Sequence, residues 1–161
     1  RFLRADFGDV SIVSVYHPSG TSGDERQDFK MIWLEDFQKY VVELQKSRPN
    51  LILCGDYNIC HEPIDIHDPI RNAKNSGFLP EEREWMTRFL SAGFTDTFRF
   101  LNPDKQEYTW WSYRFNSRSK NKGWRIDYCM VSDNMKPKVK AAYILNDAVH
   151  SDHCPAVLEI E

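Results

Sequence analysis

The 161-residue sequence predicts one α/β domain built around a largely buried β-sheet. Two segments have the apolar spacing of amphipathic helices, strand-like segments alternate with them early and dominate later, and the length suits a single core. An apolar content of 41% with 28% charged residues is ordinary for a globular protein. No apolar run approaches the roughly 20 residues that span a bilayer, and the cysteine pattern described below leads us to expect a cytoplasmic protein.

The N-terminal half contains a strand, a helix, a second strand and a second helix. Residues 10–16 alternate between Val or Ile and smaller residues, which indicates a strand. Residues 28–46 repeat apolar side chains every three or four positions, which predicts a helix. The apolar run at 51–54 suits a strand covered on both faces. A further helix begins at Pro80 and ends before Gly93.

The C-terminal half is expected to be rich in strands. The candidate strands are Tyr108 to Tyr113, Arg125 to Val131, Lys138 to Leu145 and Cys154 to Ile160. Before them lies a long polar segment at 57–77, whose two prolines exclude a continuous helix. Loops of this length in compact domains are usually functional.

The cysteines and the net charge exclude some functions. The four cysteines are Cys54, Cys60, Cys129 and Cys154. None forms a CxxC pair, so we expect reduced, buried thiols and no zinc site. The net charge of −3 provides no global attraction to nucleic acid, so any such binding requires a local basic patch.

The stretch LILCGDYN, residues 51–58, places an acid and an amide at the end of an apolar strand. Residues two apart in an extended chain point to the same side, so Asp56 and Asn58 are expected to point together beyond the sheet. A polar turn explains the same pattern, because Asp and Asn are common turn residues. This stretch alone supports both interpretations equally.

Two further polar groups lie where strands are expected to meet loops. Asp127 stands inside the apolar run WRIDYCMV and needs a partner, which could be Arg125 in a structural salt bridge. Asp152 and His153 in HSDH are adjacent and should point to opposite sides of an extended chain, one holding a metal and the other a proton. An incidental histidine is the simpler explanation of that motif alone. Asp127, however, offers His153 the orienting carboxylate that a catalytic imidazole requires.

Residues 109–126 combine basic and aromatic side chains without a single acid. The basic residues are Arg114, Arg118, Lys120, Lys122 and Arg125, and the aromatic ones are Trp110, Trp111, Tyr113, Phe115 and Trp124. Basic groups contact phosphates, and aromatic rings stack on bases or line a pocket for a displaced sugar. The alternative is a solvated cationic hairpin with tryptophans in the core, and alternation places Trp111 there. In a negatively charged chain, this concentration favours a surface that faces a polyanion.

Five motifs, in order, resemble segments of the exonuclease III / apurinic–apyrimidinic endonuclease family. They are VYHPSG (15–20), GDYN (55–58), NAKNSGF (72–78), RSKNKGWRIDY (118–128) and SDH (151–153). GDYN and SDH alone would indicate only the wider DNase I-like superfamily, whereas the other matches are more specific to DNA repair enzymes. The resemblance covers nearly the whole chain and implies a four-layer α/β/β/α sandwich. Residues 1–161 would then be the C-terminal portion of that domain, without its N-terminal strands.

The resemblance also implies an activity. It is hydrolysis of DNA phosphodiesters 5′ to abasic sites, dependent on Mg²⁺ or Mn²⁺, with a 3′→5′ exonuclease or 3′-phosphodiesterase activity. The implied partner is duplex DNA carrying abasic sites or 3′ ends, with no membrane and no obligate protein partner.

The same resemblance assigns roles to the polar residues. Asp56 would orient or deprotonate the attacking water, and Asn58 would donate to that water or to a phosphate oxygen. His153, held by Asp127, would stabilise charge on the phosphoryl group. Asp152 would help bind the metal.

One further catalytic position, Tyr16, and six DNA-contacting positions match the family. Tyr16 and Asn75 match residues near the target phosphate, and Trp124 matches the wall of the pocket for the extruded sugar. The remaining members are Trp110 and Ile126 in that pocket, and Tyr113 and Lys120 on the DNA backbone.

Two departures from the family pattern stand out. Ser19 replaces an asparagine, so one substrate contact is lost or supplied by a neighbour. A metal-binding glutamate of the family lies upstream of the matched region, so we expect residues 1–161 alone to bind metal poorly and to be inactive or weak. Sheet edges without a partner strand would favour self-association.

Two alternative functions are compatible with the sequence. One is a phosphodiesterase or phosphatase of the same superfamily that acts on RNA or small phosphoesters. The other is a DNA-binding module without turnover.

Overall fold

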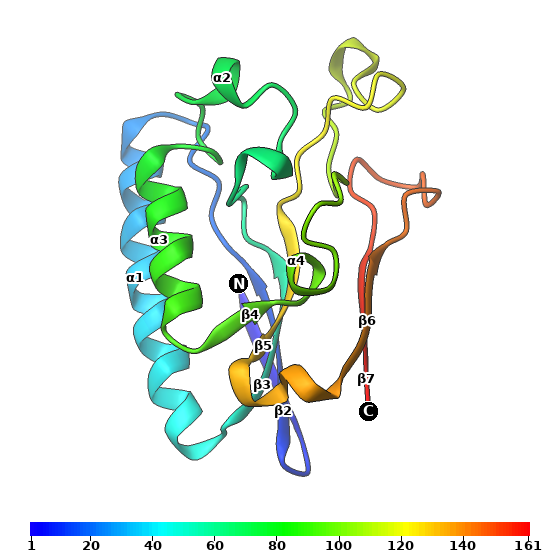
Figure 1. Ribbon diagram of the computed structural model, residues 1–161. Coiled ribbons are helices and arrows are strands. Elements are labelled where there is room, and N and C mark those ends of the chain that lie inside the picture. Colours follow the sequence, from blue (N-terminus) through cyan, green and yellow to red (C-terminus); the bar gives the residue numbers. More distant parts are fainter.

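The computed structural model describes all of residues 1–161 and contains a helical layer, a five-stranded sheet and a two-stranded sheet (Figure 1). The strands are β1 (Phe2–Phe7), β2 (Val10–Tyr16), β3 (Asn50–Asp56), β4 (Phe94–Asp96), β5 (Asp127–Ser132), β6 (Val139–Ile144) and β7 (Ala156–Ile160). The α-helices are α1 (Asp24–Ser47), α2 (Pro69–Asn72), α3 (Pro80–Ser91) and α4 (Thr97–Leu101), and short 3₁₀ turns occur at Pro63–Asp65, Arg114–Asn116 and Asp133–Lys138.

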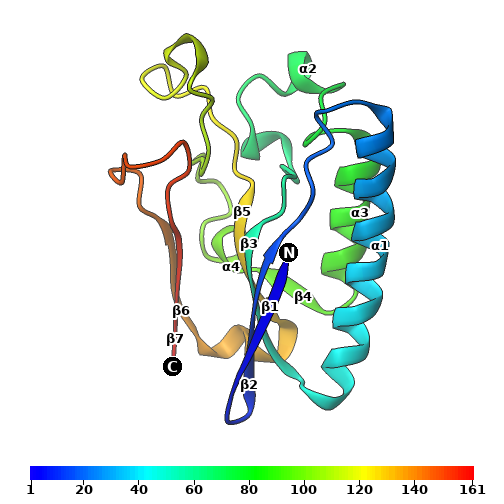
Figure 2. The ribbon, with the colours of Figure 1, turned by 180° about the vertical axis from the view of Figure 1, so that it is seen from behind.

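Helices α1 and α3 cover one face of the five-stranded sheet, and the β6–β7 sheet lies on the other side (Figures 1 and 2). The α1 face toward the sheet carries Leu34, Phe37 and Val41, which are buried in a 16-residue core with Trp85 and Phe89 of α3. Burial of this apolar stripe, recurring every three or four residues, is the main stabilising contribution to α1. The two sheets and the helical layer correspond to three layers of the expected sandwich.

The sheet order is β1-β2-β3-β5-β4, in which only β2 and β3 are parallel. The parallel pair requires a crossover, and α1 supplies it. The register places Tyr16 beside Asp56, and Asp56 beside Asp127. Directly paired residues project to the same face of a sheet, so three neighbouring strands present one predicted site residue each at a common edge.

Most predicted elements are confirmed, with shifted ends. The strand at 10–16 and the helices at 28–46 and 80–92 correspond to β2, α1 and α3. The predicted strand at Tyr108 to Tyr113 is wrong, because this segment makes only isolated bridges from Trp110 to Trp124 and His153. Strands β1 and β4 and helix α4 were not predicted individually.

The cysteines are free, as predicted, but they are not all buried. Cys60 and Cys154 are buried, whereas Cys54 and Cys129 are only partly buried. The difference arises because Cys54 and Cys129 project from the sheet face opposite the helices.

Candidate active site

Two carboxylates and one imidazole converge where β3 ends and β5 begins. Asp56 and Asp127 are direct cross-strand neighbours, and the Nδ1 atom of His153 lies 2.8 Å from Oδ2 of Asp127. One ligand atom from each of the three residues lies within 4.8 Å of the other two. We call these three residues the acid–histidine cluster. The expected partnership of Asp127 and His153 is present, and the alternative partner of Asp127, Arg125, instead binds Asp65 and Asp96.

The backbone around Asp56 is shaped by its neighbours. Gly55 has φ +146°, and a Cβ there would stand 1.8 Å from the carbonyl oxygen of Val15, so the close approach of β2 and β3 requires glycine. Asn58 has φ 51°, in the left-handed region. It therefore leaves the extended path that sequence spacing predicted. Its backbone N–H and its side-chain Nδ2 nevertheless donate to Asp56, at 2.7 and 3.1 Å.

The electrostatics of the cluster are unbalanced. Burial, followed by the neighbouring charge of Asp127, raises the pKa of Asp56 to about 7. Burial lowers the pKa of His153, but the hydrogen bond and charge of Asp127 outweigh it, so the net pKa is raised. A carboxyl group with a pKa of about 7, beside an imidazole whose raised pKa favours its protonated form, suits proton transfer and charge stabilisation.

A cleft of about 1060 Å³ opens above the cluster. Asp56 and His153 line it, together with six other predicted site residues: Tyr16, Asn58, Asn75, Trp110, Trp124 and Ile126. Ser19, at the position that departs from the family pattern, also lines it. Eight of the twelve predicted site residues therefore border one cavity, although they come from five separate segments of the chain.

Trp110 connects the aromatic wall to the cluster. It forms bridges with Trp124 and with His153, and its Nε1 donates to Oδ2 of Asp152 at 3.0 Å. Burial raises the pKa of Asp152, but the hydrogen bonds from Trp110 and Ser151 outweigh it and lower the net pKa. Asp152 is thus kept anionic beside His153 of the cluster.

A buried ion pair between Lys30 and Glu82 supports the turns that carry Asn58 and Asn75 at the cleft. The sequence analysis did not identify it. The Nζ atom of Lys30 donates to Oε1 of Glu82 at 2.5 Å and to the carbonyl oxygen of Asn58 at 2.7 Å. Oε2 of Glu82 accepts from the backbone N–H groups of Gly77 and Leu79 at 2.6 and 3.0 Å. Both charged side chains are fully buried. The pair joins α1 and α3 to the turns that carry Asn58 and Asn75.

The sequence did contain a signal for this ion pair. Lys30 precedes Leu34, Phe37, Val41 and Leu44 on the buried stripe of α1. A lysine in such a stripe needs an anionic partner, because burial of an unpaired charge is very costly.

Two predicted DNA contacts lie away from the cleft lining. Tyr113 and Lys120 are exposed on the 109–126 segment. Fewer basic side chains of that segment are available to DNA than the sequence suggested. Arg125 is buried in ion pairs, and Arg118 donates to the backbone carbonyls of Ser151, Asn146 and Ala148.

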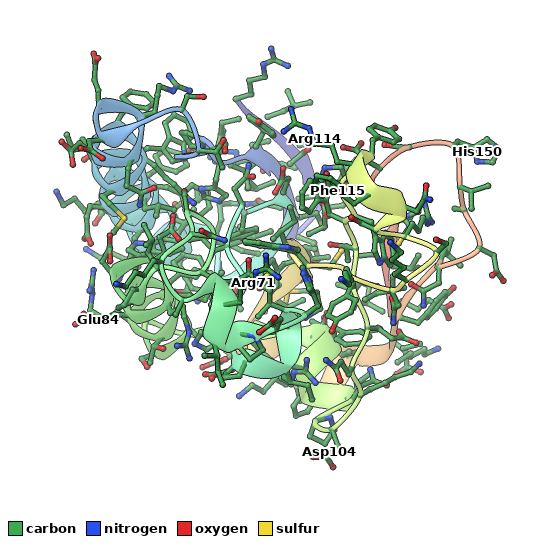
Figure 3. All side chains as sticks on the ribbon, turned by 90° about the horizontal axis from the view of Figure 1, so that it is seen from above. Arg71, Glu84, Asp104, Arg114, Phe115 and His150 are labelled. Carbon is green, nitrogen blue, oxygen red and sulfur yellow. The ribbon has the colours of Figure 1, made fainter.

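Arg114, Lys120 and Lys122 remain exposed on the same segment. Arg114 and Arg71 of α2 lie at the same end of the molecule, seen from that end in Figure 3. Trp111 packs in a core cluster with Phe98 and Ile144, as alternation predicted.

The donor set at this edge fits a hard divalent cation. Asp56 and Asp127 supply carboxylate oxygens, the ligand type preferred by Mg²⁺ and Mn²⁺, and a third carboxylate, Asp152, adjoins His153 in the chain. The raised pKa of Asp56 has burial as its first cause and repulsion from Asp127 as its second, and a bound cation would relieve that repulsion.

Comparison with known families agrees with the geometry. A model of the Endonuclease/Exonuclease/phosphatase family matches residues 2–153, and the chain belongs to this family. An exodeoxyribonuclease of Bacillus subtilis is 45% identical over 161 residues, which cover 99% of this chain and 64% of the relative. The DNA repair nuclease APEX1 of Danio rerio is 46% identical over 159 residues, covering 98% of this chain and 51% of the relative.

The fold has a close counterpart among solved structures. The structure of an AP endonuclease from Archaeoglobus fulgidus superposes with a TM-score of 0.93 at 26% identity, over 100% of this chain and 65% of that one. The chain therefore has a mixed α/β, DNase I-like fold and spans half to two thirds of these proteins' lengths. None of its helices is both long and apolar enough to cross a bilayer.

Proposed function

We propose that this chain carries the hydrolytic centre of a DNA repair nuclease that cleaves the phosphodiester 5′ to abasic sites in duplex DNA. The single observation that carries this proposal is the convergence of Asp56, Asp127 and His153 within 4.8 Å, with Asp56 and His153 lining an aromatic- and amide-lined cleft. The relatives named as a DNA repair nuclease and an AP endonuclease support the choice of substrate.

In the proposed reaction, Asp56 takes a proton from the attacking water. Its pKa of about 7 makes it a base matched to neutral pH. The Nδ2 atom of Asn58 donates to Oδ2 of Asp56 and to the carbonyl oxygen of His17, which fixes the direction of the carboxylate. Asp56 is therefore positioned at the end of a strand, where its orientation is set by two neighbouring segments.

His153 acts on the phosphoryl oxygens. Its Nδ1 contacts Asp127, so its Nε2 is free to donate a hydrogen bond into the cleft. The raised pKa favours the protonated imidazolium, which stabilises the negative charge that develops in the transition state. Tyr16, beside Asp56 in register, and Asn75 on the opposite wall contact the same phosphate.

Asp152, which adjoins His153 in the chain, would help hold Mg²⁺ or Mn²⁺ at this edge of the sheet. Such an ion supplies neutralisation of the leaving 3′ oxygen. The chain by itself offers few carboxylates for a cation that prefers six oxygen ligands, so we propose that residues 1–161 alone bind it weakly and turn over slowly.

The extruded abasic sugar would enter the pocket formed by Trp110, Trp124 and Ile126. An intact nucleotide is bulkier than a sugar without a base, so the indole of Trp124 would exclude it. Tyr113, Lys120 and the other exposed cations of the 109–126 segment would contact the backbone of the duplex.

The decisive test is an assay of the chain, and of the complete gene product that contains it, on matched duplexes with and without one abasic site. We expect cleavage that requires Mg²⁺ or Mn²⁺ and prefers the abasic duplex. Trp124→Ala should reduce this preference by about tenfold, the size of one lost hydrophobic discrimination. Equal cleavage of RNA, intact DNA and abasic DNA would favour the general phosphodiesterase, and binding without cleavage would favour a DNA-binding module.

A second candidate activity is 3′→5′ exonuclease action, favoured by the 45% identity to an exodeoxyribonuclease. The same residues would serve, with a 3′ terminus in the cleft. Shortening of an intact recessed duplex without internal incision of a circular abasic duplex would select this activity.

A further inference from the structure

Two cysteines face each other directly behind the acid–histidine cluster. The β3–β5 register pairs Cys54 with Cys129, two positions along from the pair of Asp56 and Asp127. Residues two apart on a strand project to the same side, so both thiols lie on the carboxylate face, away from the helices. The proposed hydrolysis uses neither cysteine.

The strand spacing suits a covalent link. Directly opposed residues in an antiparallel pair have Cα atoms about 4.5 or 5.5 Å apart, and disulfides need about 4.4–6.8 Å. The thiol of Cys129 donates to the carbonyl oxygen of Ala156 at 3.7 Å and would turn from it toward Cys54. A disulfide therefore requires no change of strand register.

Accessibility separates this pair from the other thiols. Cys54 and Cys129 are partly exposed and line a hollow of about 450 Å³, which Ala148, His150 and Pro155 also border. Cys60 is fully buried, and its thiol donates to the carbonyl oxygen of Asp65. Cys154 lines the same hollow but is only 3% exposed.

We propose that Cys54 and Cys129 form a modification site that a small-molecule disulfide such as oxidised glutathione converts to a cross-strand disulfide. In the first step, the thiolate of one cysteine attacks the oxidant, forms a mixed disulfide and releases one glutathione thiolate. In the second, the other cysteine, as its thiolate, attacks the protein-side sulfur and releases the second glutathione. Two protein thiols lose their hydrogens, one protein disulfide forms, and the protons end on two glutathione molecules.

The new bond would link β3 and β5 immediately behind Asp56 and Asp127. Directly opposed Cβ atoms lie about 4.5–5.5 Å apart, whereas a disulfide holds them at about 3.8 Å, so oxidation would draw the two strands together. Any effect of this movement on cleavage rests on the proposed function. The modification itself does not.

The test is oxidation of the native chain with oxidised glutathione, followed by thiol counting and peptide mapping. We expect the free thiols to fall from four to two, with Cys54 joined to Cys129. Cys54→Ser and Cys129→Ser should each abolish this link, and Cys54→Ala and Cys129→Ala should do the same if serine disturbs the strands. Cys60→Ser and Cys154→Ser, the matched controls, should preserve it.

The same oxidation in concentrated urea supplies a further control, because there the preference for one pair should disappear. Glutathione adducts on Cys54 and Cys129 without a link between them would overturn the proposal. A native link from Cys54 or Cys129 to Cys154 of equal abundance would overturn it as well.

Discussion

Two polar clusters meet at the start of β5, and they differ in charge balance. The first, which we call the arginine cluster, consists of Arg125, Arg99, Asp65 and Asp96. The second is the acid–histidine cluster. Arg125 and Asp127 are only two residues apart in the sequence, yet each belongs to a different cluster.

The arginine cluster is buried and balanced. Arg125 is 1% exposed and binds Asp96 through two parallel hydrogen bonds of 3.1 and 2.7 Å, while Asp65 accepts from both arginines. Burial raises the pKa of Asp65, but Arg125 outweighs it and the net pKa is lowered. Each charge has an opposite neighbour, which is the arrangement of a structural network.

The acid–histidine cluster is half-buried and unbalanced. Two carboxylates share a strand edge with one imidazole, and the pKa of Asp56 rises to about 7, where that of Asp65 falls. The surroundings of Asp56 and Asp65 therefore shift the pKa values of these two carboxyl groups in opposite directions. The acid–histidine cluster, whose carboxylates lack enough positive partners and border a cleft, therefore has the character of a functional site. The arginine cluster, in which every charge has an opposite partner, has the character of a structural ion-pair network.

The largest expected effect concerns catalysis. In the complete gene product, His153→Ala should lower turnover of abasic duplex by about 10²- to 10⁴-fold, because charge stabilisation at the phosphoryl group is lost. DNA binding, measured by fluorescence anisotropy, should be largely retained. His150→Ala is the matched control, since His150 is exposed and lies outside the main cleft. Wild-type turnover by the His153 variant would reject the assigned role.

The arginine cluster should respond in stability. Arg125→Met should lower the free energy of unfolding by about 3–5 kcal/mol, because it leaves two buried carboxylates without their main partner. Urea unfolding measures this change. Arg4→Met, which removes an exposed ion pair with Asp6, should cost no more than about 1 kcal/mol. If both variants lowered the free energy of unfolding by a similarly small amount, the buried arginine network would contribute no more to stability than an exposed ion pair does.

The buried ion pair between Lys30 and Glu82 offers a second test of how much a buried, paired charge contributes to stability. Glu82→Gln alone should destabilise by about 3 kcal/mol, since it leaves the Lys30 charge buried. The double variant Lys30→Met with Glu82→Gln should cost less than the sum of the single variants, with a coupling of about 1–3 kcal/mol by urea unfolding. Strict additivity would mean that the pair does not act as a unit.

Asp56→Asn should change stability less than Arg125→Met or Glu82→Gln does, and in the opposite direction. Because the folded-state pKa of Asp56 is about 7 against an ordinary 3.8, the folded chain binds the proton more tightly than the unfolded chain. The contribution of Asp56 to stability is thus lost as the pH rises from about 4 to 7.

The substitution should therefore raise the free energy of unfolding at pH 8 by about 2 kcal/mol, discounted for partial exposure, and change it little at pH 4. Thermal unfolding at the two pH values measures this. Destabilisation by Asp56→Asn at pH 8 would contradict the account.

Local patterns predicted much of this molecule. The periodicity of α1 and the alternation in β2 depend on neighbours in the sequence, and both were found within a few residues of their expected limits. Short β4 and α4 have three and five residues, too few to establish a period. The 108–113 segment alternates like a strand, but its neighbours offer it only single bridges.

Site residues that belong to recognisable sequence motifs could be predicted. Ion-pair partners that lie far apart in the sequence could not. His153 and Asp127 were expected together and lie 2.8 Å apart. Arg125 was only the alternative partner of Asp127, and its actual carboxylate partner Asp65 is 60 positions away and is brought close by the turn at Pro63–Asp65. Local spacing carries no information about such pairing, which only the assembled fold determines.

The most direct measurement is a carbon-13 NMR titration of the Asp56 carboxyl group in the absence of divalent cations. The account predicts an apparent pKa of about 7, which should fall when Asp127→Asn removes the neighbouring charge. Titration of Asp56 near its ordinary pKa of 3.8, unchanged by Asp127→Asn, would contradict the convergence on which the proposed chemistry depends.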